Sequence, residues 1–217
     1  MGGIERKASR RVIQTEALAY LKAHPADEGT SVVTSLPDVS EMSELSFDQW
    51  RSWFVEASAL ILRWVPPRGV AIFYQSDIRY RGKWVDKSYL IQRAAEEAGA
   101  DLLWHRIVCR KPAGTFSLGR PSYSHLVCFA TGPRSAETKP FPDVLPDAGL
   151  MPWSRAMGAN ACQLCCDYLL KQTETKLVVD PFCGKGTVLA VANAMGLDAL
   201  GMDISAKRCR AARNMVF

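Results

Sequence analysis

The chain has 217 residues, of which 48% are hydrophobic and 23% charged, and its formal net charge is +5. This composition is that of a globular protein, and the length suits one domain with a sizeable core. No apolar run approaches the ~18–20 residues that a membrane-spanning helix needs. The basic N-terminal segment lacks the apolar run of a secretory signal, so we expect an intracellular protein, in the cytoplasm or nucleus. The small positive charge permits binding to nucleic acid without requiring it.

The first 130 residues are predicted to form helices alternating with strands. Ser46 is a typical helix N-cap and Gly99 a typical residue at a helix C-terminus. Trp50, Trp53 and Trp64 have helical spacing and are predicted to be core residues rather than a stacking platform. The expected elements are a basic helix over 5–24, a strand over 31–36, a helix from 46 to 64, a strand over 70–74, an irregular polar stretch over 75–85, a helix over 87–98, and strands over 101–109 and 125–130.

The prolines of residues 131–152 predict a linker. After it we expect a helix over 158–172, a strand over 176–180, a glycine turn, a helix over 187–195, a strand over 199–203 and a final helix. Strands that alternate with helices are typical of a Rossmann-like α/β fold with a doubly wound, mainly parallel sheet. The 101–130 hairpin would add an antiparallel edge to that sheet.

Seven cysteines are present, which is an odd number. Cys162, Cys165 and Cys166 have the spacing of half a zinc site, but the sequence contains no second pair of ligands with suitable spacing. They lie in an apolar stretch, so we interpret them as one buried face of a helix. No metal is predicted.

The densest motif is a strand that ends at Asp180, a turn with Gly184 and Gly186, and a helix that begins at Thr187. Its strand would deliver Asp180 to the carboxyl edge of the sheet, where open α/β sheets bind ligands. The next strand ends at Asp203, an acid placed to accept hydrogen bonds from a ribose. A dinucleotide fingerprint fails for lack of a third glycine, and a P-loop fails because Gly186 follows Lys185.

The eight residues from Asp180 to Thr187, D-P-F-C-G-K-G-T, resemble the D-P-F-x-G-x-G-T motif of the S-adenosylmethionine-dependent amino-methyltransferases of DNA and RNA. The resemblance implies S-adenosyl-L-methionine as cofactor, with Asp180 near its amino group, Asp203 on its ribose and Ile204 on its adenine. The alternative is a purely structural motif, a glycine-capped turn with an ordinary Asp at the end of a strand. The cofactor-binding residues expected from the resemblance are Ser154, Met157, Asp180, Pro181, Phe182, Cys183, Gly184, Gly186, Thr187, Asp203 and Ile204.

Only about 30 residues follow the glycine motif, too few for four further strands, so the remaining strands must precede it. This order resembles the circularly permuted, β-type amino-methyltransferases, in which a segment just ahead of the motif covers the methionine end of the cofactor. Ser154 and Met157 lie in the corresponding segment, 152–158. We therefore divide one methyltransferase domain, 1–217, into a basic N-terminal helix (1–28), a target-handling half (29–130), a linker (131–152) and a cofactor-binding half (153–217).

The first strand is followed by Ser35-Leu36-Pro37-Asp38, where the resembling family has D-P-P-Y or S-P-P-W. Methylation of an amino group needs acceptors that hold the nitrogen so that its lone pair faces the methyl group. Ser35 and the Leu36 carbonyl are candidates for that task. Asp38 replaces an aromatic that would stack on a flipped base, and it could instead act as a general base. The alternative is a purely structural turn that ends the strand.

Further residues are candidates for substrate binding. Gln75 and Asp77 follow the second strand, where they either line a substrate pocket or merely cap the strand. The loop 110–124 combines cations with an aromatic, which suits phosphates and stacked bases, although a solvated polar loop is an equal alternative. Its candidates are Arg110, Lys111, Arg120 and Tyr123.

The sequence thus predicts a methyltransferase that modifies a base amino group in RNA or DNA. RNA is slightly favoured because no separate DNA-reading module is visible. A methyltransferase acting on a protein or small molecule, and a non-catalytic cofactor-binding partner subunit, are the alternatives.

Overall fold

The computed structural model describes residues 7–132 and 141–217. Eight strands form one sheet in the order β1-β10-β9-β2-β3-β7-β6-β8, and β4 and β5 form a separate two-stranded sheet. The strands are β1 (Arg10–Gln14), β2 (Thr30–Thr34), β3 (Ala71–Gln75), β4 (Ile78–Tyr80), β5 (Lys83–Val85), β6 (Asp101–Cys109), β7 (Tyr123–Ala130), β8 (Val144–Leu145), β9 (Leu177–Asp180) and β10 (Asp198–Asp203).

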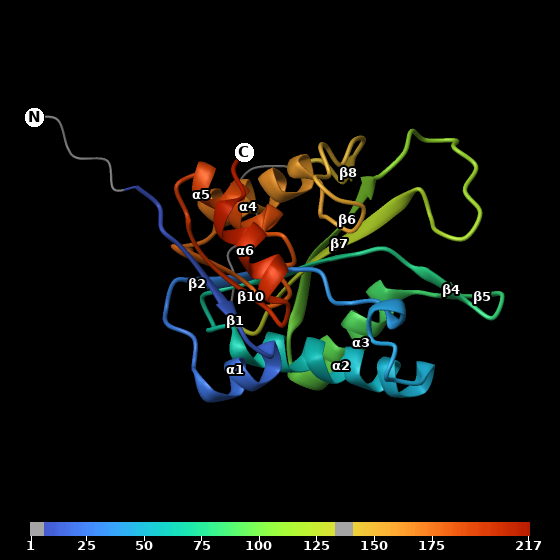
Figure 1. The fold of residues 1–217 in the computed structure, drawn as a ribbon, viewed down its shortest axis with the longest axis horizontal. Helices are drawn as coiled ribbons and strands as arrows, with labels where there is room; N and C mark the ends of the chain where they lie inside the picture. Colours follow the sequence, from blue (N-terminus) through green and yellow to red (C-terminus); the bar gives the residue numbers. More distant parts are fainter. Residues whose placement is uncertain (1–6, 133–140) are drawn as a thin grey trace, which may run out of the picture.

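Helices cover both faces of the large sheet, as expected for a doubly wound fold. In Figure 1, α1, α2 and α3 lie below the sheet and α4, α5 and α6 above it. Each layer packs on its own apolar cluster, one built around Trp50 and Phe54 of α2 and the other around the buried cysteines of α4. The helices are α1 (Ala17–Ala23), α2 (Phe47–Trp64), α3 (Lys87–Ala98), α4 (Ala159–Gln172), α5 (Thr187–Ala194) and α6 (Ala206–Asn214), with a short 3-10 helix, η1 (Val39–Glu41).

The central strands β1, β10, β9, β2 and β3 run parallel, whereas β7 is antiparallel to both β3 and β6. This confirms the predicted mainly parallel sheet with an antiparallel hairpin. The last two strands of the chain, β9 and β10, lie between β1 and β2 in the sheet. The carboxyl ends of β9, β10, β2 and β3 therefore meet at one edge, although they come from opposite ends of the sequence.

The N-terminal segment differs from its prediction as a helix over 5–24. Residues 10–14 form β1, which pairs in parallel with β10, and only residues 17–23 are helical. The carboxylate of Glu16 begins α1 by accepting hydrogen bonds from the N–H groups of Leu18 and Ala19, at 2.9 and 2.6 Å. β1 lies beyond β10 at the edge of the sheet. Its strand conformation depends on pairing with residues almost 190 positions away, which no local pattern reveals.

Two stretches predicted to be irregular contain strands. Residues 78–85 form the β4–β5 hairpin, and Val144 and Leu145 pair in parallel with Ile107 and Val108 of β6. The described part of the expected 131–152 linker is thus partly attached to the sheet, and residues 133–140 lie outside the described residues.

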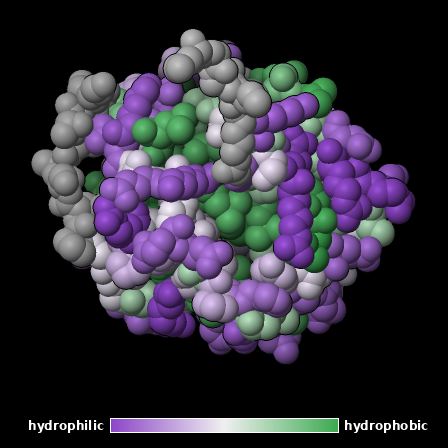
Figure 2. All heavy atoms as spheres, turned by 90° about the vertical axis from the view of Figure 1, so that its left-hand side faces the viewer, coloured by the Kyte–Doolittle hydropathy of each residue, from purple (hydrophilic) through white to green (hydrophobic). Residues whose placement is uncertain are grey.

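The predicted helices and their ends are otherwise reproduced closely. Ser46 caps α2, accepting a hydrogen bond from the N–H of Gln49, and Gly99 ends α3 with a φ of 67°. Cys162, Cys165 and Cys166 are buried on α4, as interpreted from the sequence. In the described ranges, none of the helices is long and apolar enough to cross a bilayer. Figure 2 shows the side of the molecule near β1, where apolar surface is visible between hydrophilic side chains.

Candidate active site

A cavity of about 540 Å³ opens at the carboxyl edge of the sheet. This volume lies within the range of small-molecule and cofactor sites. Its wall combines the ends of β2, β9 and β10 with α1, η1, α2 and the segment before α4. The predicted site residues that line it are Ser35, Leu36, Pro37, Met157, Asp180, Pro181, Phe182, Cys183, Gly184, Thr187, Asp203 and Ile204.

Asp180 ends β9 and is only 4% exposed. Its Oδ1 accepts hydrogen bonds from Thr34 Oγ1 at 2.7 Å and from the Phe182 N–H at 3.1 Å. Burial nevertheless raises the pKa of this carboxyl to about 7, against the opposing effect of the two hydrogen bonds. Such a shift is typical of functional sites, where a cavity keeps a carboxylate from water.

The two glycines of the turn have positive φ, +53° at Gly184 and +87° at Gly186. A Cβ on Gly184 would lie 2.7 Å from Trp153 Cζ2, and one on Gly186 would lie 2.8 Å from Ala212 Cα in α6. The glycines therefore permit the close approach of a tryptophan ring and of a helix, as well as the turn itself. Gly186 packs on α6 and does not line the cavity.

Thr187 begins α5 in the wall of the cavity. Its Oγ1 is buried and makes no hydrogen bond within the described residues. A buried hydroxyl left unpaired is costly, so its position in the cavity wall suits a ligand atom. Burial also raises the pKa of the Cys183 thiol, which therefore stays uncharged.

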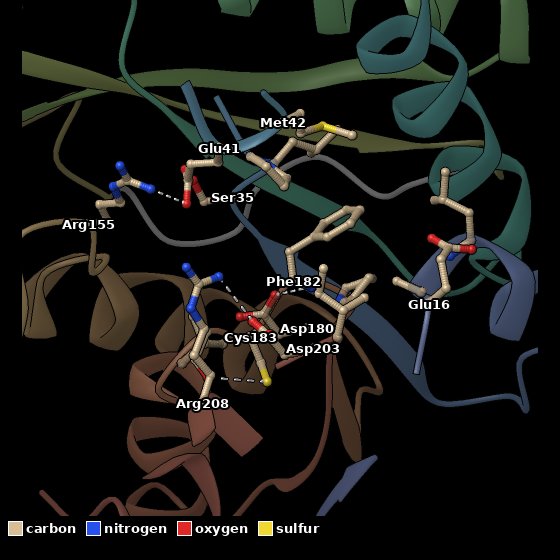
Figure 3. A pocket seen from close by; sticks show the side chains of 18 of the residues that line it. Glu16, Ser35, Glu41, Met42, Arg155, Asp180, Phe182, Cys183, Asp203 and Arg208 are labelled. Carbon is tan, nitrogen blue, oxygen red and sulfur yellow. Dashed lines mark hydrogen bonds and ion pairs between the residues drawn. The ribbon is translucent and has the colours of Figure 1, made fainter. Parts of the chain in front are cut away.

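Asp203 ends β10 beside Asp180 in the cavity (Figure 3). Its Oδ1 accepts a hydrogen bond of 2.7 Å from the Ser205 N–H, and its Oδ2 lies 3.6 Å from Arg208 Nη1. Ile204, the next residue, is 72% exposed and also lines the cavity. A carboxylate with an adjacent exposed aliphatic side chain can receive a sugar and the flat base attached to it.

Ser35, Leu36 and Pro37 follow β2 and form the opposite wall. Trp50 Nε1 donates a hydrogen bond of 3.1 Å to the Pro37 carbonyl, which fixes this turn against α2. Asp38 does not line the cavity, in contrast to the other three members of the predicted tetrapeptide.

The carboxylate of Asp38 is held by two cations. Lys87 Nζ forms an ion pair with Oδ1, and Arg120 Nη2 lies 3.2 Å from Oδ2. The Lys87 side chain is only 3% exposed, and desolvation lowers its pKa while Asp38 acts in the opposite direction. Both oxygens of Asp38 already face cations and the residue lies outside the cavity, so the geometry favours a scaffold role for Asp38 over the alternative of a general base.

The segment before α4 contacts the glycine turn through Trp153. That it covers the methionine end of the cofactor, as the resemblance implies, stays a prediction. Trp153, Arg155, Ala156 and Met157 line the cavity, whereas the predicted Ser154 does not. The centroid of the Trp153 ring lies near two cations, 5.6 Å from Lys185 Nζ and 5.9 Å from Arg208 Cζ. Figure 3 shows Arg155 reaching Glu41, an ion pair of 2.6 Å that ties this segment to η1 on the other wall.

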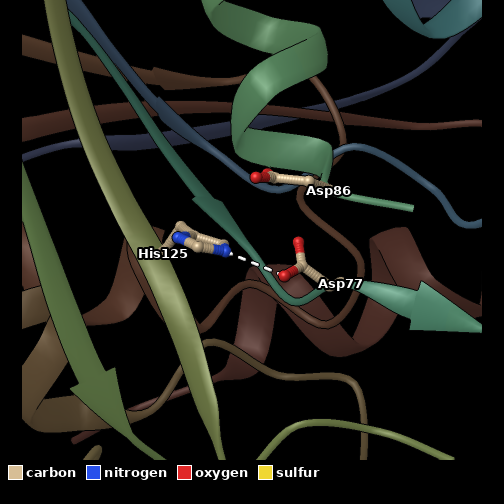
Figure 4. A group of neighbouring side chains, drawn as sticks. All are labelled: Asp77, Asp86 and His125. Carbon is tan, nitrogen blue, oxygen red and sulfur yellow. Dashed lines mark hydrogen bonds and ion pairs between the residues drawn. The ribbon is translucent and has the colours of Figure 1, made fainter. Parts of the chain in front are cut away.

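A second polar cluster lies at the end of β3, outside the cavity. His125 Nε2 lies 3.0 Å from Asp77 Oδ2 (Figure 4). His125 Nδ1 lies 2.9 Å from His105 Nε2. Asp77 Oδ1 also accepts a hydrogen bond of 3.0 Å from the Lys87 N–H. Ligand atoms of Asp77, Asp86 and His125 lie within 4.8 Å of one another and could hold a cation. The hydrogen bonds account for this arrangement without one, and the absence of a metal stays a prediction.

The predicted substrate-binding residues are Gln75, Asp77, Arg110, Lys111, Arg120 and Tyr123, and none of them lines the cavity. Arg110 reaches Ser76 at 3.2 Å, and the Tyr123 ring packs edge-on against His125. Gln75 is buried, and its amide makes no hydrogen bond within the described residues.

Sequence reasoning missed several polar side chains of the cavity wall. They lie in segments without a recognisable motif, and only the fold brings them to the strand ends. They are Glu16, Lys22, Glu41, Glu44, Glu56, Arg155 and Arg208.

Residues 169–214, which contain the glycine turn and Asp203, match the N6/N4 family model described as DNA methylase. No curated protein matches the chain.

Several solved structures share the fold. A putative DNA modification methylase from Thermus thermophilus, complexed with S-adenosyl-L-methionine, aligns with a TM-score of 0.70 and 18% identity, covering 94% of this chain and 91% of that one. The PvuII DNA methyltransferase, cytosine-N4-specific, aligns with a TM-score of 0.74 and 14% identity, covering 96% of this chain and 87% of that one. At these identities the likeness shows a shared fold, that of class I methyltransferases. The match of residues 169–214 to the family model confirms the resemblance to the amino-methyltransferases, and this chain is an S-adenosylmethionine-dependent methyltransferase.

Proposed function

We propose that this enzyme methylates an amino group of a base in DNA. The observation that carries the proposal is one cavity whose walls hold both the Ser35–Pro37 turn and the glycine turn with its two strand-end carboxylates. A methyl donor and an acceptor nitrogen bound in the same cavity would be neighbours. Such alignment supplies much of the catalysis in a transfer reaction.

The residues of the cavity fit S-adenosyl-L-methionine. Asp203 would accept hydrogen bonds from the ribose hydroxyls, with Ile204 against the adenine and Asp180 beside the amino group. The unpaired hydroxyl of Thr187 would gain a partner. When bound, the cofactor supplies an activated methyl group on a positively charged sulfur.

The acceptor side would be formed by the turn after β2. Ser35 Oγ and the Leu36 carbonyl are assigned to hold the amino group of the base, and the bond from Trp50 to the Pro37 carbonyl keeps the turn in place. The nitrogen would gain the methyl group as the sulfonium becomes a neutral thioether, and it would release one proton to water. Asp38 is assigned to position the turn, because its two oxygens already face Lys87 and Arg120.

We propose DNA rather than the RNA that the sequence alone slightly favoured. The matched family model is described as DNA methylase, and the similar structures named above are DNA-modifying enzymes. The preference for RNA rested on the lack of a visible DNA-reading module, which is weaker than these positive matches.

Transfer of a tritiated methyl group to DNA, RNA and protein extract tests the proposal. We expect label in DNA, in an amino group of adenine or cytosine once the product is digested.

Ser35→Ala should lower turnover about 100-fold while cofactor affinity stays unchanged, because it removes an acceptor of the target. Asp203→Ala should weaken cofactor binding about 10–100-fold in calorimetry, the usual effect of losing charged hydrogen bonds.

Label in protein or RNA alone would overturn the choice of substrate. Equal loss of cofactor affinity in both variants would contradict the division of the cavity into a donor and an acceptor side.

A further inference from the structure

The β4–β5 hairpin stands apart from the large sheet. Among the described residues, 78–85 form ladder pairs only with each other, Ile78 with Val85, Arg79 with Trp84 and Tyr80 with Lys83. In Figure 1 the hairpin projects away from the body of the molecule beyond the end of β3. A two-stranded hairpin is marginally stable on its own, so contacts at its base must hold it.

One face of the hairpin supplies those contacts. Ile78 is buried, and the Tyr80 ring stacks on Phe47 of α2 with ring centroids 4.0 Å apart and planes 8° apart. Neighbouring pairs in an antiparallel ladder point to opposite faces. The Arg79–Trp84 pair therefore faces outward, with the arginine Cζ 5.4 Å from the tryptophan ring and Trp84 53% exposed.

The tip of the hairpin holds a strained arginine. Arg81 has a φ of 49° and Gly82 a φ of 80°, and Arg81 is the one non-glycine residue with positive φ within the described ranges. A two-residue hairpin turn with both φ values positive favours Asn-Gly, because asparagine tolerates this conformation far better than other side chains. Strain retained at an exposed tip points to a task for the side chain rather than for the fold.

The hairpin is also uniformly basic. Residues 78–85 contain Arg79, Arg81 and Lys83 and no acidic residue, and all three side chains are exposed. Exposed cations beside an exposed tryptophan are the groups that bind phosphates and stack on bases.

The base of the hairpin is connected to the target side of the active site. Asp77 precedes β4, and Lys87, two residues after β5, donates its N–H to Asp77 at 3.0 Å. The side chain of Lys87 pairs with Asp38, directly after the Ser35–Pro37 turn. The hairpin is thereby held next to the wall of the cavity that would receive the target base.

We propose that the β4–β5 hairpin binds the phosphate backbone of DNA beside the target base, through Arg79, Arg81 and Lys83, and that Trp84 stacks on a neighbouring exposed base. This inference rests on the proposed function, since DNA is the polyanion that the active site would address.

Arg81→Asn separates this role from a structural one, because it removes the cation and relaxes the turn at the same time. We expect a higher midpoint of thermal unfolding, together with weaker binding to a short fluorescein-labelled DNA duplex measured by anisotropy. Arg81→Lys keeps the charge and should bind DNA nearly as wild type does. Lys176→Gln, at the amino end of β9 and away from the cavity, is the control for loss of an exposed cation.

The salt dependence of binding gives a quantitative measure. Each phosphate contact contributes a slope of about −0.9 in a plot of log affinity against log salt for duplex DNA. The triple variant Arg79→Gln, Arg81→Asn, Lys83→Gln should make that slope less negative by about 2 to 3. Trp84→Ala should weaken binding to single-stranded DNA several-fold.

Unchanged DNA affinity in Arg81→Asn and an unchanged slope in the triple variant would overturn the inference while leaving DNA methylation by the wild type intact. A wild type that binds S-adenosyl-L-methionine but neither binds nor methylates DNA would instead refute the proposed function, and this inference with it.

Discussion

Thr34 Oγ1 donates a 2.7 Å hydrogen bond to Asp180 Oδ1, joining two residues that are 146 positions apart in the sequence. Thr34 ends β2 and Asp180 ends β9, and the two strands pair in parallel. The bond therefore links the strand of the acceptor turn to the strand of the glycine turn. It also opposes the rise in the pKa of Asp180 that burial causes.

Removing this bond with Thr34→Val should raise the pKa of Asp180 above its value of about 7. A hydrogen bond to a carboxylate stabilises its charged form, so its loss favours the protonated acid. The pH at which cofactor affinity reaches half its maximum should move to higher pH by calorimetry, in parallel with that pKa. Thr30→Val, at the opposite end of β2 from Asp180, is the matched control. An unmoved midpoint would mean that Asp180 does not control binding.

Cofactor affinity should depend on pH through the same carboxyl. With a pKa of about 7, Asp180 loses most of its charge below neutral pH and attracts a positively charged amino group less. An α-amino group releases its own proton at about pH 8. Affinity should therefore be highest between these two pKa values. At a pH one unit below the pKa of Asp180, it should be about tenfold weaker than this maximum.

Asp180→Asn should remove the acidic limb and leave the basic one. If the pH profile of the variant keeps both limbs, the amino group is bound elsewhere.

Stability should respond to pH in the opposite direction from most carboxyls. Because the folded pKa of Asp180 lies above its ordinary value of 3.8, the folded state holds a proton that the unfolded state releases. The contribution of this group to the free energy of unfolding therefore falls as pH rises from about 4 to 7 and is constant above that. Urea unfolding of the wild type and Asp180→Asn across this range isolates it. The difference between the two proteins should change within that window only.

Gly184→Ala should destabilise the fold by about 2 kcal/mol, through backbone strain at positive φ and through contact with Trp153. Gly99 has a φ of +67° and no atom within 4 Å of an added Cβ, so Gly99→Ala measures the backbone effect alone. Gly184→Ala should lower the free energy of unfolding by more than Gly99→Ala does. This difference should disappear when Trp153→Ala is introduced together with Gly184→Ala. Denaturant unfolding of the wild type, Gly184→Ala, Trp153→Ala and the double variant completes this cycle. A persistent difference would place the clash elsewhere.

Lys87→Met should destabilise the protein by about 3 kcal/mol, because it leaves the carboxylate of Asp38 without its buried partner. The double variant Lys87→Met, Asp38→Asn should recover most of this loss, since it leaves no buried charge unpaired; Arg120, the other partner of Asp38, is 46% exposed and remains solvated. Chemical unfolding provides both values. A double variant as unstable as Lys87→Met alone would show that packing of the lysine stem, and not its charge, matters here.

The features that could be predicted from the sequence are those formed by residues close together in the chain. The strand, the turn and the helix around Asp180 and Thr187 are contiguous, so the sequence motif predicted a cofactor site there, and the family match agrees with it. The Ser35–Pro37 turn was also located. The engagement of Asp38 by Lys87 and Arg120 was not, because those residues lie 49 and 82 positions away.

The strand β1 and the contact between Trp153 and the glycine turn were missed for a related reason. Arg10–Gln14 is too short and too basic to indicate a strand without its partner β10. Trp153 reaches Gly184 from a segment of irregular backbone, and neither residue alone signals the contact. Such features are set by tertiary pairing, which a single sequence does not display.

The side chain of Arg10 in β1 donates hydrogen bonds to the carbonyls of Ala212 in α6 and of Met215 just after it, at 3.0 and 2.5 Å. The first strand and the last helix are therefore neighbours, so a short peptide bridge could connect them without disturbing the sheet. Opening such a closed chain ahead of α4 would place the glycine turn near the new start. The cofactor-binding half would then precede the target-handling half along the chain, as in unpermuted methyltransferases, while the tertiary structure stayed the same. The order of the two halves is therefore a property of chain connectivity and not of the fold.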